Sequence, residues 1–97
     1  MNMQAMLSQA NNIKAKVDKA LAEFDKKVFE YDYKNGSIIT QIFGSSKIFK
    51  IKINDILIDK DDKEMLEQMV AEAINEAVLS TTADRNEISN KITSGAF

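Results

Sequence analysis

The chain has 97 residues, of which 13 are basic and 15 are acidic, and its formal net charge is −2. It contains no cysteine and no histidine, which excludes disulfides, thiolate nucleophiles, zinc–thiolate sites and the commonest general base. It has no run of about 18 apolar residues that could span a membrane, and its first residues lack the pattern of a signal peptide. We therefore expect one domain, no membrane partner and a cytoplasmic location, which suits a cysteine-free chain.

The small net charge conceals an uneven distribution of charged residues. Lysines outnumber acids between residues 35 and 58, whereas acids outnumber basic residues from residue 59 to the end. An acidic segment can therefore offset a basic surface elsewhere on the molecule, and the negative net charge does not exclude a polyanion as a partner.

The first segment carries an apolar seam, in which apolar residues recur at alternating intervals of three and four. The seam consists of Met3, Met6, Ala10, Ile13, Val17, Ala20 and Phe24, with Leu7 and Leu21 beside it. This spacing predicts a helix over residues 2–26, about 37 Å long. Strands of eight residues reach only about 27 Å. The outer end of the seam should therefore overhang the sheet, and a second copy of the chain is the simplest partner for it.

Three strands are predicted after this helix, because the apolar period changes from 3.6 to 2 at Lys27. The predicted strands span residues 27–34, 37–43 and 47–54. Asn35-Gly36 is a strong hairpin signal, since both residues tolerate the positive φ that a tight turn needs. Gly44-Ser45-Ser46 predicts the second turn. The expected sheet is an antiparallel meander of three strands.

Alternation along the strands also predicts which residues share a face. In the first strand, Phe29, Tyr31 and Tyr33 lie on one side, where they can pack under a helix or stack on nucleic-acid bases. The pattern favours packing under a helix. In the third strand, one face is expected to hold Phe49, Ile51 and Ile53, and the other Ile48, Lys50 and Lys52.

A second helix is predicted over residues 59–80, and Asp61 followed by Glu64 resembles a capping box. The acidic run that opens this segment could also suggest a calcium loop. However, the EF-hand template fails at its glycine and at its final glutamate, so helix capping is favoured. The apolar pattern weakens after Leu79, and residues 81–97 are expected to form a weakly ordered or helical tail.

The sequence offers little support for catalysis. It has no Gly-x-Ser-x-Gly elbow and no glycine-rich phosphate loop, and the general base and thiol are missing. We therefore expect no enzyme activity, no cofactor, no metal site and no small-molecule substrate. A catalyst that uses carboxylates alone is the weakest of the hypotheses that we consider.

Three stretches of the chain are characteristic in their order and length: MNMQAMLSQANNIKAKVDKALAEF, NGSIITQIFGSSKIFKIKIN and DKDDKEMLEQMVAEAINEAV. They resemble, in turn, the first helix, the central strands and the second helix of the YbaB/EbfC family of small bacterial nucleoid-associated proteins. The resemblance covers nearly the whole chain. One departure is Thr40-Gln41, where the family often places a lysine, and it reduces the positive charge near the sheet.

The resemblance implies an α+β protomer with the order α-β-β-β-α and a long N-terminal helix. It also implies an intertwined homodimer with projecting helices. Such a dimer would bind double-stranded DNA with little sequence specificity, associate with the nucleoid and contribute to nucleoid organisation or gene regulation, without catalysis.

Lysine placement supplies the candidate DNA contacts, which are Lys14, Lys16, Lys19, Lys26, Arg85 and Lys91. The candidate dimer contacts are Met3, Met6, Leu7, Ala10 and Ile13. Two alternatives stay open. The lysines could belong to a solvated face with local pairs such as Lys14 with Asp18, and the seam could bind a helix of another protein without any nucleic acid.

Overall fold

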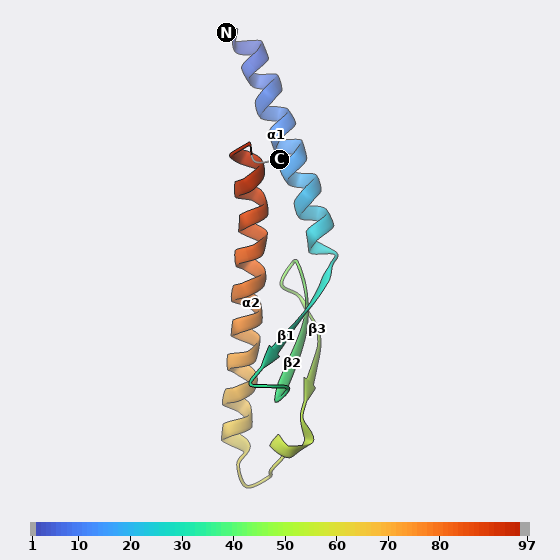
Figure 1. Ribbon diagram of the computed structural model, residues 1–97, viewed down its shortest axis with the longest axis vertical. Coiled ribbons are helices and arrows are strands. Elements are labelled where there is room, and N and C mark those ends of the chain that lie inside the picture. The colour runs from blue at the N-terminus through green and yellow to red at the C-terminus, as the bar shows by residue number, and fades with distance from the viewer. Residues whose placement is uncertain (1, 96–97) are drawn as a thin grey trace.

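The computed structural model describes residues 2–95 and is elongated, extending 70 Å along its longest axis and 17 Å along each of the others. Its elements are α1 (Met3–Asp25), β1 (Val28–Tyr33), β2 (Ile38–Phe43), β3 (Ile48–Ile53), the 3-10 helix η1 (Asp55–Leu57) and α2 (Lys63–Thr93), as Figure 1 shows. The strands form one antiparallel sheet in the order β1-β2-β3. The predicted α+β protomer with the order α-β-β-β-α is confirmed.

Helix α1 begins at Met3 because the Asn2 side chain caps its first turn, accepting a hydrogen bond from the Ala5 backbone N–H at 2.7 Å. Its N-terminal part extends beyond the end of α2 and beyond the sheet (Figure 1). Met6 and the other large apolar residues of this part are exposed, whereas Phe24 at the opposite end is buried. The apolar seam therefore overhangs the sheet as predicted.

Helix α2 covers one face of the sheet and forms the core with it. The buried strand residues are Tyr33, Ile38, Thr40 and Ile42. Ala73 and Ala77 of α2 are also buried, and their small methyl side chains allow the helix to approach the sheet closely. The opposite face of the sheet, which we call the outer face, is covered by no helix of the described residues.

A β-bulge in β3 changes the predicted distribution of its side chains. The register between β2 and β3 shifts at positions 41/42, which leaves Phe49 as the extra residue. Phe49 is 58% exposed and packs edge-on against Phe43, with ring centroids 5.5 Å apart. The prediction that Phe49 shares a face with Ile51 and Ile53 is therefore wrong, because an inserted residue interrupts the alternation of side chains along a strand.

The two hairpin turns depend on their glycines in different ways. Asn35 and Gly36 have φ values of 53° and 83°, which agrees with the predicted need for positive φ at the first turn. At the second turn, Gly44 lies against the end of α1. A Cβ atom at this position would lie 2.0 Å from the backbone oxygen of Phe24, and the Gly44 N–H donates to the Lys27 backbone oxygen at 2.9 Å.

The start of α2 corrects two predictions. The helix begins at Lys63 and not at residue 59, because η1 and a turn occupy the preceding segment. In that turn the Asp59 side chain accepts a hydrogen bond from the Asp61 N–H at 2.9 Å, a local contact that competes with helix. The N-cap is Asp62, which makes no side-chain cap hydrogen bond, so the predicted capping box at Asp61 is wrong.

The end of α2 corrects the prediction that the helix stops at residue 80. The helix continues to Thr93, so the helical alternative holds for that part of the tail, and residues 96–97 lie outside the described residues. Thr81 and Ile92 are buried in this extension. The sequence pattern is weak here because a polar residue, Thr81, takes a position that faces the core.

Candidate nucleic-acid interface

Four of the candidate DNA contacts belong to α1 or to its C-cap, Lys26, and all four side chains are exposed; we call them the α1 lysines. They are Lys14, Lys16, Lys19 and Lys26. Within residues 2–95 the ion pairs join other residues, so the alternative of a local pair between Lys14 and Asp18 is not observed. These four ammonium groups are therefore available to an external anion.

Two grooves between α1 and α2 adjoin these lysines. The first, of about 370 Å³, is lined by Lys16, Ala20, Glu23, Phe24, Lys27, Ile88 and Ile92. The second, of about 470 Å³, is lined by Gln9, Asn12, Ile13, Lys16 and residues 92–95. Lys16 borders both grooves, and the amides of Gln9 and Asn12 add hydrogen-bonding groups of the kind that contact phosphate and sugar oxygens.

The two candidate cations on α2 are held by acidic side chains. Arg85 donates two hydrogen bonds to the Asp25 carboxylate, at 2.7 and 3.0 Å, and Lys91 Nζ lies 2.9 Å from Glu87 Oε1. The hydrogen bond from Arg85 lowers the pKa of Asp25 below its ordinary value of 3.8. The six predicted contacts thus separate into the four α1 lysines, which are in no ion pair among residues 2–95, and two paired cations on α2.

Sequence reasoning missed the role of Arg85 in joining α2 to the end of α1. Asp25 and Arg85 are 60 residues apart, so no local spacing brings them together in the sequence. The apolar pattern is interrupted after Leu79, and this interruption was a signal for such a contact. An arginine in this segment needs an acidic partner if its side chain faces another element.

The aromatic residues of β1 pack beneath α2, as the favoured interpretation predicted. The Tyr33 hydroxyl donates a hydrogen bond to a carboxylate oxygen of Glu72, which raises the pKa of Tyr33. The Thr81 hydroxyl donates to the Tyr31 hydroxyl oxygen at 3.3 Å. The ring of Phe29 packs against the ring of Phe24 in α1, with the two ring centroids 5.0 Å apart. The Tyr33 ring is therefore part of the core, and the half-buried Phe29 and Tyr31 pack against the helices.

Lys50 and Lys52 lie on the outer face of the sheet, apart from the α1 lysines. Both are exposed, and they pair across the ladder with Gln41 and Ile39 of β2. The polar face that the sequence predicts for these two lysines is therefore correct.

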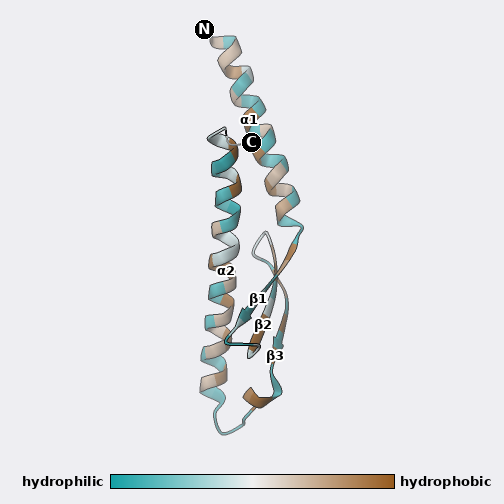
Figure 2. Cartoon of the chain, in the orientation of Figure 1, coloured by the Kyte–Doolittle hydropathy of each residue, from teal (hydrophilic) through white to brown (hydrophobic). Residues whose placement is uncertain are grey.

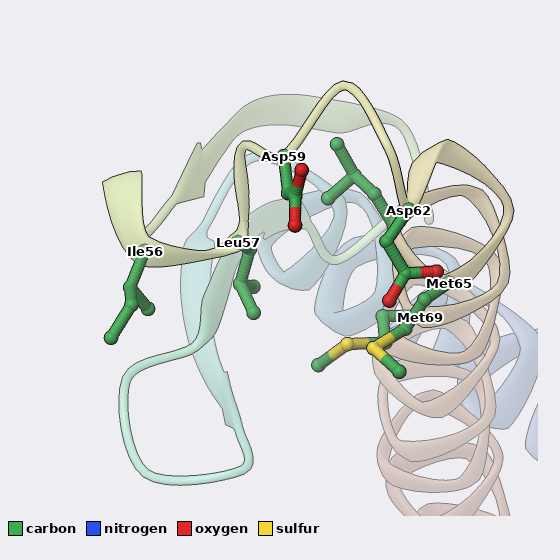
Figure 3. A pocket seen from close by; sticks show the side chains of 7 residues that line it. Ile56, Leu57, Asp59, Asp62, Met65 and Met69 are labelled. Atoms are coloured by element: carbon green, nitrogen blue, oxygen red, sulfur yellow. The ribbon is translucent and has the colours of Figure 1, made fainter.

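The end of the molecule formed by η1 and the start of α2 is acidic and apolar. A cavity of about 100 Å³ lies there, and Figure 3 shows Asp59, Asp62, Met65 and Met69 around it. Ile56 of η1 is 83% exposed, and Figure 2 shows η1 as strongly hydrophobic. Among residues 2–95, no group of three or more His, Cys, Asp or Glu is placed to hold a metal ion. Carboxylates at this end would repel phosphate groups.

The sequence pattern of the YbaB/EbfC DNA-binding family matches residues 1–96. The chain belongs to this family. It is 47% identical over 97 residues to a nucleoid-associated protein of Malacoplasma penetrans, covering 100% of this chain and 98% of that protein. It is 34% identical over 90 residues to a nucleoid-associated protein of Ureaplasma parvum, covering 93% of this chain and 90% of the relative. The resemblance stated from the sequence is confirmed, and the family is a DNA-binding family and not an enzyme family.

A solved structure supports the fold independently of close sequence similarity. The crystal structure of an uncharacterized protein from Helicobacter pylori matches with a TM-score of 0.78, over 96% of this chain and 98% of that chain, at 14% sequence identity. In addition, none of the helices described in residues 2–95 has the length and hydropathy needed to cross a membrane.

Proposed function

We propose that the protein binds double-stranded DNA as a homodimer, with little sequence specificity, and contributes to nucleoid organisation or gene regulation. The observation that carries this proposal is the set of four unpaired, exposed lysines on one helix of a chain that belongs to a DNA-binding family. Nucleoid-associated relatives support a location on the nucleoid in the cytoplasm.

The chemistry of lysine explains why sequence specificity is expected to be low. Lys14 and Lys26 are separated by about 18 Å along α1, a length over which several phosphates of one duplex can be reached. Ammonium groups contact phosphates as point charges and carry no base information. Arg85 and Lys91 remain proposed contacts, although each would share its charge with the acid that holds it. Binding should therefore depend on charge much more than on sequence.

The proposed homodimer also uses the outer end of the apolar seam. The proposed contacts are Met3, Met6, Leu7, Ala10 and Ile13, most of which are exposed. Burial of apolar side chains is favourable by about 25 cal/mol per Å². Contact of this end with a second copy, or contact between the tips of the two projecting helices, would therefore stabilise the homodimer.

Fluorescence anisotropy with labelled duplexes tests the proposal. We expect binding at low salt to two duplexes of unrelated sequence, with affinities within about tenfold of each other, since phosphate contacts dominate. Absence of binding at low salt would contradict DNA binding. A difference of a thousandfold or so between the duplexes would contradict low specificity, because it matches the range of specific recognition.

The alternative is a protein-interaction module that binds no nucleic acid, and the exposed seam end favours it as a second candidate. It predicts a monomer that pairs with a helix of another protein. Analytical ultracentrifugation of the pure protein distinguishes the two, because a stable homodimer that binds duplex DNA contradicts the module.

A further inference from the structure

The end of the molecule opposite the projecting part of α1 exposes several apolar side chains (Figure 1). Ile56 of η1 is 83% exposed, Ile58 directly after η1 is 62% exposed, and Met65 in the first turn of α2 is 54% exposed. We call these three residues, together with the cavity between η1 and α2 (Figure 3), the η1 patch. Apolar side chains that gather at a surface mark contact sites, whereas single exposed ones are ordinary.

The cavity of the η1 patch combines apolar walls with carboxylates. Its volume is about 100 Å³, which is smaller than the roughly 300 Å³ at which small-molecule sites begin and suits a single side chain. Leu57 and Met69 line the cavity and also pack against the core, while Asp59 and Asp62 line it from the turn before α2. A lysine or arginine side chain matches this lining, because its methylene stem meets apolar walls and its cationic head meets carboxylates.

Acidic residues outnumber basic ones around the η1 patch. Between residues 55 and 64 the exposed acids are Asp55, Asp59, Asp61, Asp62 and Glu64, and the basic residues are Lys60 and Lys63. Lys63 Nζ also lies 3.6 Å from Glu67 Oε1, so its charge is shared with a further acid. The patch is therefore electronegative and complementary to a basic segment.

We propose that the η1 patch binds a basic amphipathic helix of another protein. One lysine or arginine of that helix enters the cavity, where its head meets the carboxylates of Asp59 and Asp62. The apolar face of the helix packs on Ile56, Ile58 and Met65, which is the usual way in which an amphipathic helix docks in an apolar groove. This contact does not depend on the proposed DNA binding, because no residue of the patch is a candidate DNA contact.

The charge of the η1 patch favours this partner over other occupants. Carboxylates repel the phosphates of DNA and of an anionic lipid surface. In a two-fold contact between copies of this chain, the patch would meet the same patch, and the acids of both copies would then face each other. The patch also lies far along the molecule from the projecting end of α1 (Figure 1), so a partner bound here leaves that end free.

Binding of a model peptide tests this surface. The probe is a fluorescein-labelled peptide built only of leucine and lysine, with its leucines on one helical face. We expect fluorescence anisotropy to show binding to the wild type with a dissociation constant in the micromolar range. D59N/D62N and I56S/M65S should each raise this constant about tenfold or more, since the first removes the carboxylates at the cavity and the second removes apolar contacts. Circular dichroism checks that both variants are folded.

Matched variants elsewhere on α2 separate this contact from general attraction between opposite charges. E76Q/D84N removes as many exposed acids as D59N/D62N does, and L79S removes an apolar side chain that is 71% exposed. Both should bind the peptide like the wild type, and a peptide with glutamate in place of lysine should not bind. Absence of binding to the wild type, an equal loss in E76Q/D84N, or wild-type affinity in I56S/M65S would overturn the proposal.

Nuclear magnetic resonance locates the bound peptide on the molecule. Met65 and Met69 line the cavity, whereas Met3 and Met6 belong to the projecting end of α1. We expect the peptide to shift the methyl signals of Met65 and Met69 and to leave those of Met3 and Met6 unchanged. Shifts at Met3 and Met6 alone would place the peptide on the apolar seam and would overturn the η1 patch as its site.

Discussion

Gly44 shows how one residue fixes the junction between α1 and the sheet. The backbone of Phe24 occupies the space that a side chain would need, with its oxygen 2.0 Å from the position of a Cβ atom. The obstacle is backbone, which cannot rotate away as the end of a flexible side chain can. The second hairpin turn and the end of α1 therefore tolerate no side chain at this position.

We predict that Gly44→Ala lowers the free energy of unfolding by about 1–3 kcal/mol, the usual cost of overpacking. Urea denaturation monitored by circular dichroism measures the change. Gly36→Ala is the contrasting variant, because no atom lies within 4 Å of a Cβ there and only the positive φ is strained. A Gly44→Ala protein as stable as the wild type would show that the turn shifts freely.

The ion pair between Asp25 and Arg85 makes the stability of the helix pair depend on pH. Arg85 lowers the pKa of Asp25 in the folded state. The stability that this pair contributes is therefore fully present above the ordinary pKa of 3.8 that Asp25 has in the unfolded chain. It is lost as the pH falls through the lower, folded pKa.

We predict that Asp25→Asn is less stable than the wild type at pH 7 and that the difference shrinks below about pH 4. Thermal unfolding followed between pH 7 and pH 2 gives the comparison. Glu76→Gln, an exposed residue of α2, is the control and should track the wild type. An Asp25→Asn deficit that stays constant with pH would mean that the charge of Asp25 does not stabilise the fold.

At the scale of elements, sequence patterns correctly predict the features that depend only on residues close together in the chain. The alternation Phe29, Tyr31, Tyr33 predicts β1 and the face that packs under α2, because burial of every second residue is a property of one strand alone. The Asn35-Gly36 turn is local in the same sense. The start of α1 also follows from residues that are close in sequence.

Two features that sequence reasoning misplaces, the bulge in β3 and the end of α2, depend on distant contacts, whereas the start of α2 depends on the local contact between Asp59 and Asp61. The bulge at Phe49 follows from how β3 pairs with β2. The C-terminal extension of α2 depends on Thr81, which meets Tyr31 of β1, and on Arg85, which meets Asp25. These polar contacts leave no apolar period to recognise. Among the paired candidate contacts, Arg85 has a partner that is distant in the sequence, whereas the Glu87 partner of Lys91 lies only four residues away.

Burial of Ile92 gives a test of whether the extension of α2 is packed. Ile92 is buried in the groove beside α1, whereas Leu79 on the same helix is 71% exposed. We predict that Ile92→Ala costs about 2 kcal/mol or more of unfolding free energy and that Leu79→Ala costs less than about 0.5 kcal/mol. Equal losses in chemical denaturation would contradict packing of residues 81–93.

At the scale of the whole molecule, the basic and the acidic surfaces lie at opposite ends. The α1 lysines and the grooves beside them lie toward the N-terminal end, and the acidic cavity beside η1 lies at the other (Figures 1 and 3). This separation explains how a chain with net charge −2 can bind a polyanion, since local charge and not the net value determines the contact. A second copy in the proposed homodimer would double the number of these lysines.

The salt dependence of DNA binding tests most directly whether the α1 lysines contact DNA. If about six phosphates are neutralised, the plot of log K against log salt should have a slope of about −5. K14Q/K16Q/K19Q/K26Q should bind more weakly, with a slope less negative by about 3–4, whereas K34Q/K47Q/K60Q/K63Q, with as many lysines removed away from α1, should keep the wild-type slope. A wild-type slope in the α1 variant, or an equal change in both variants, would contradict DNA binding through the α1 lysines.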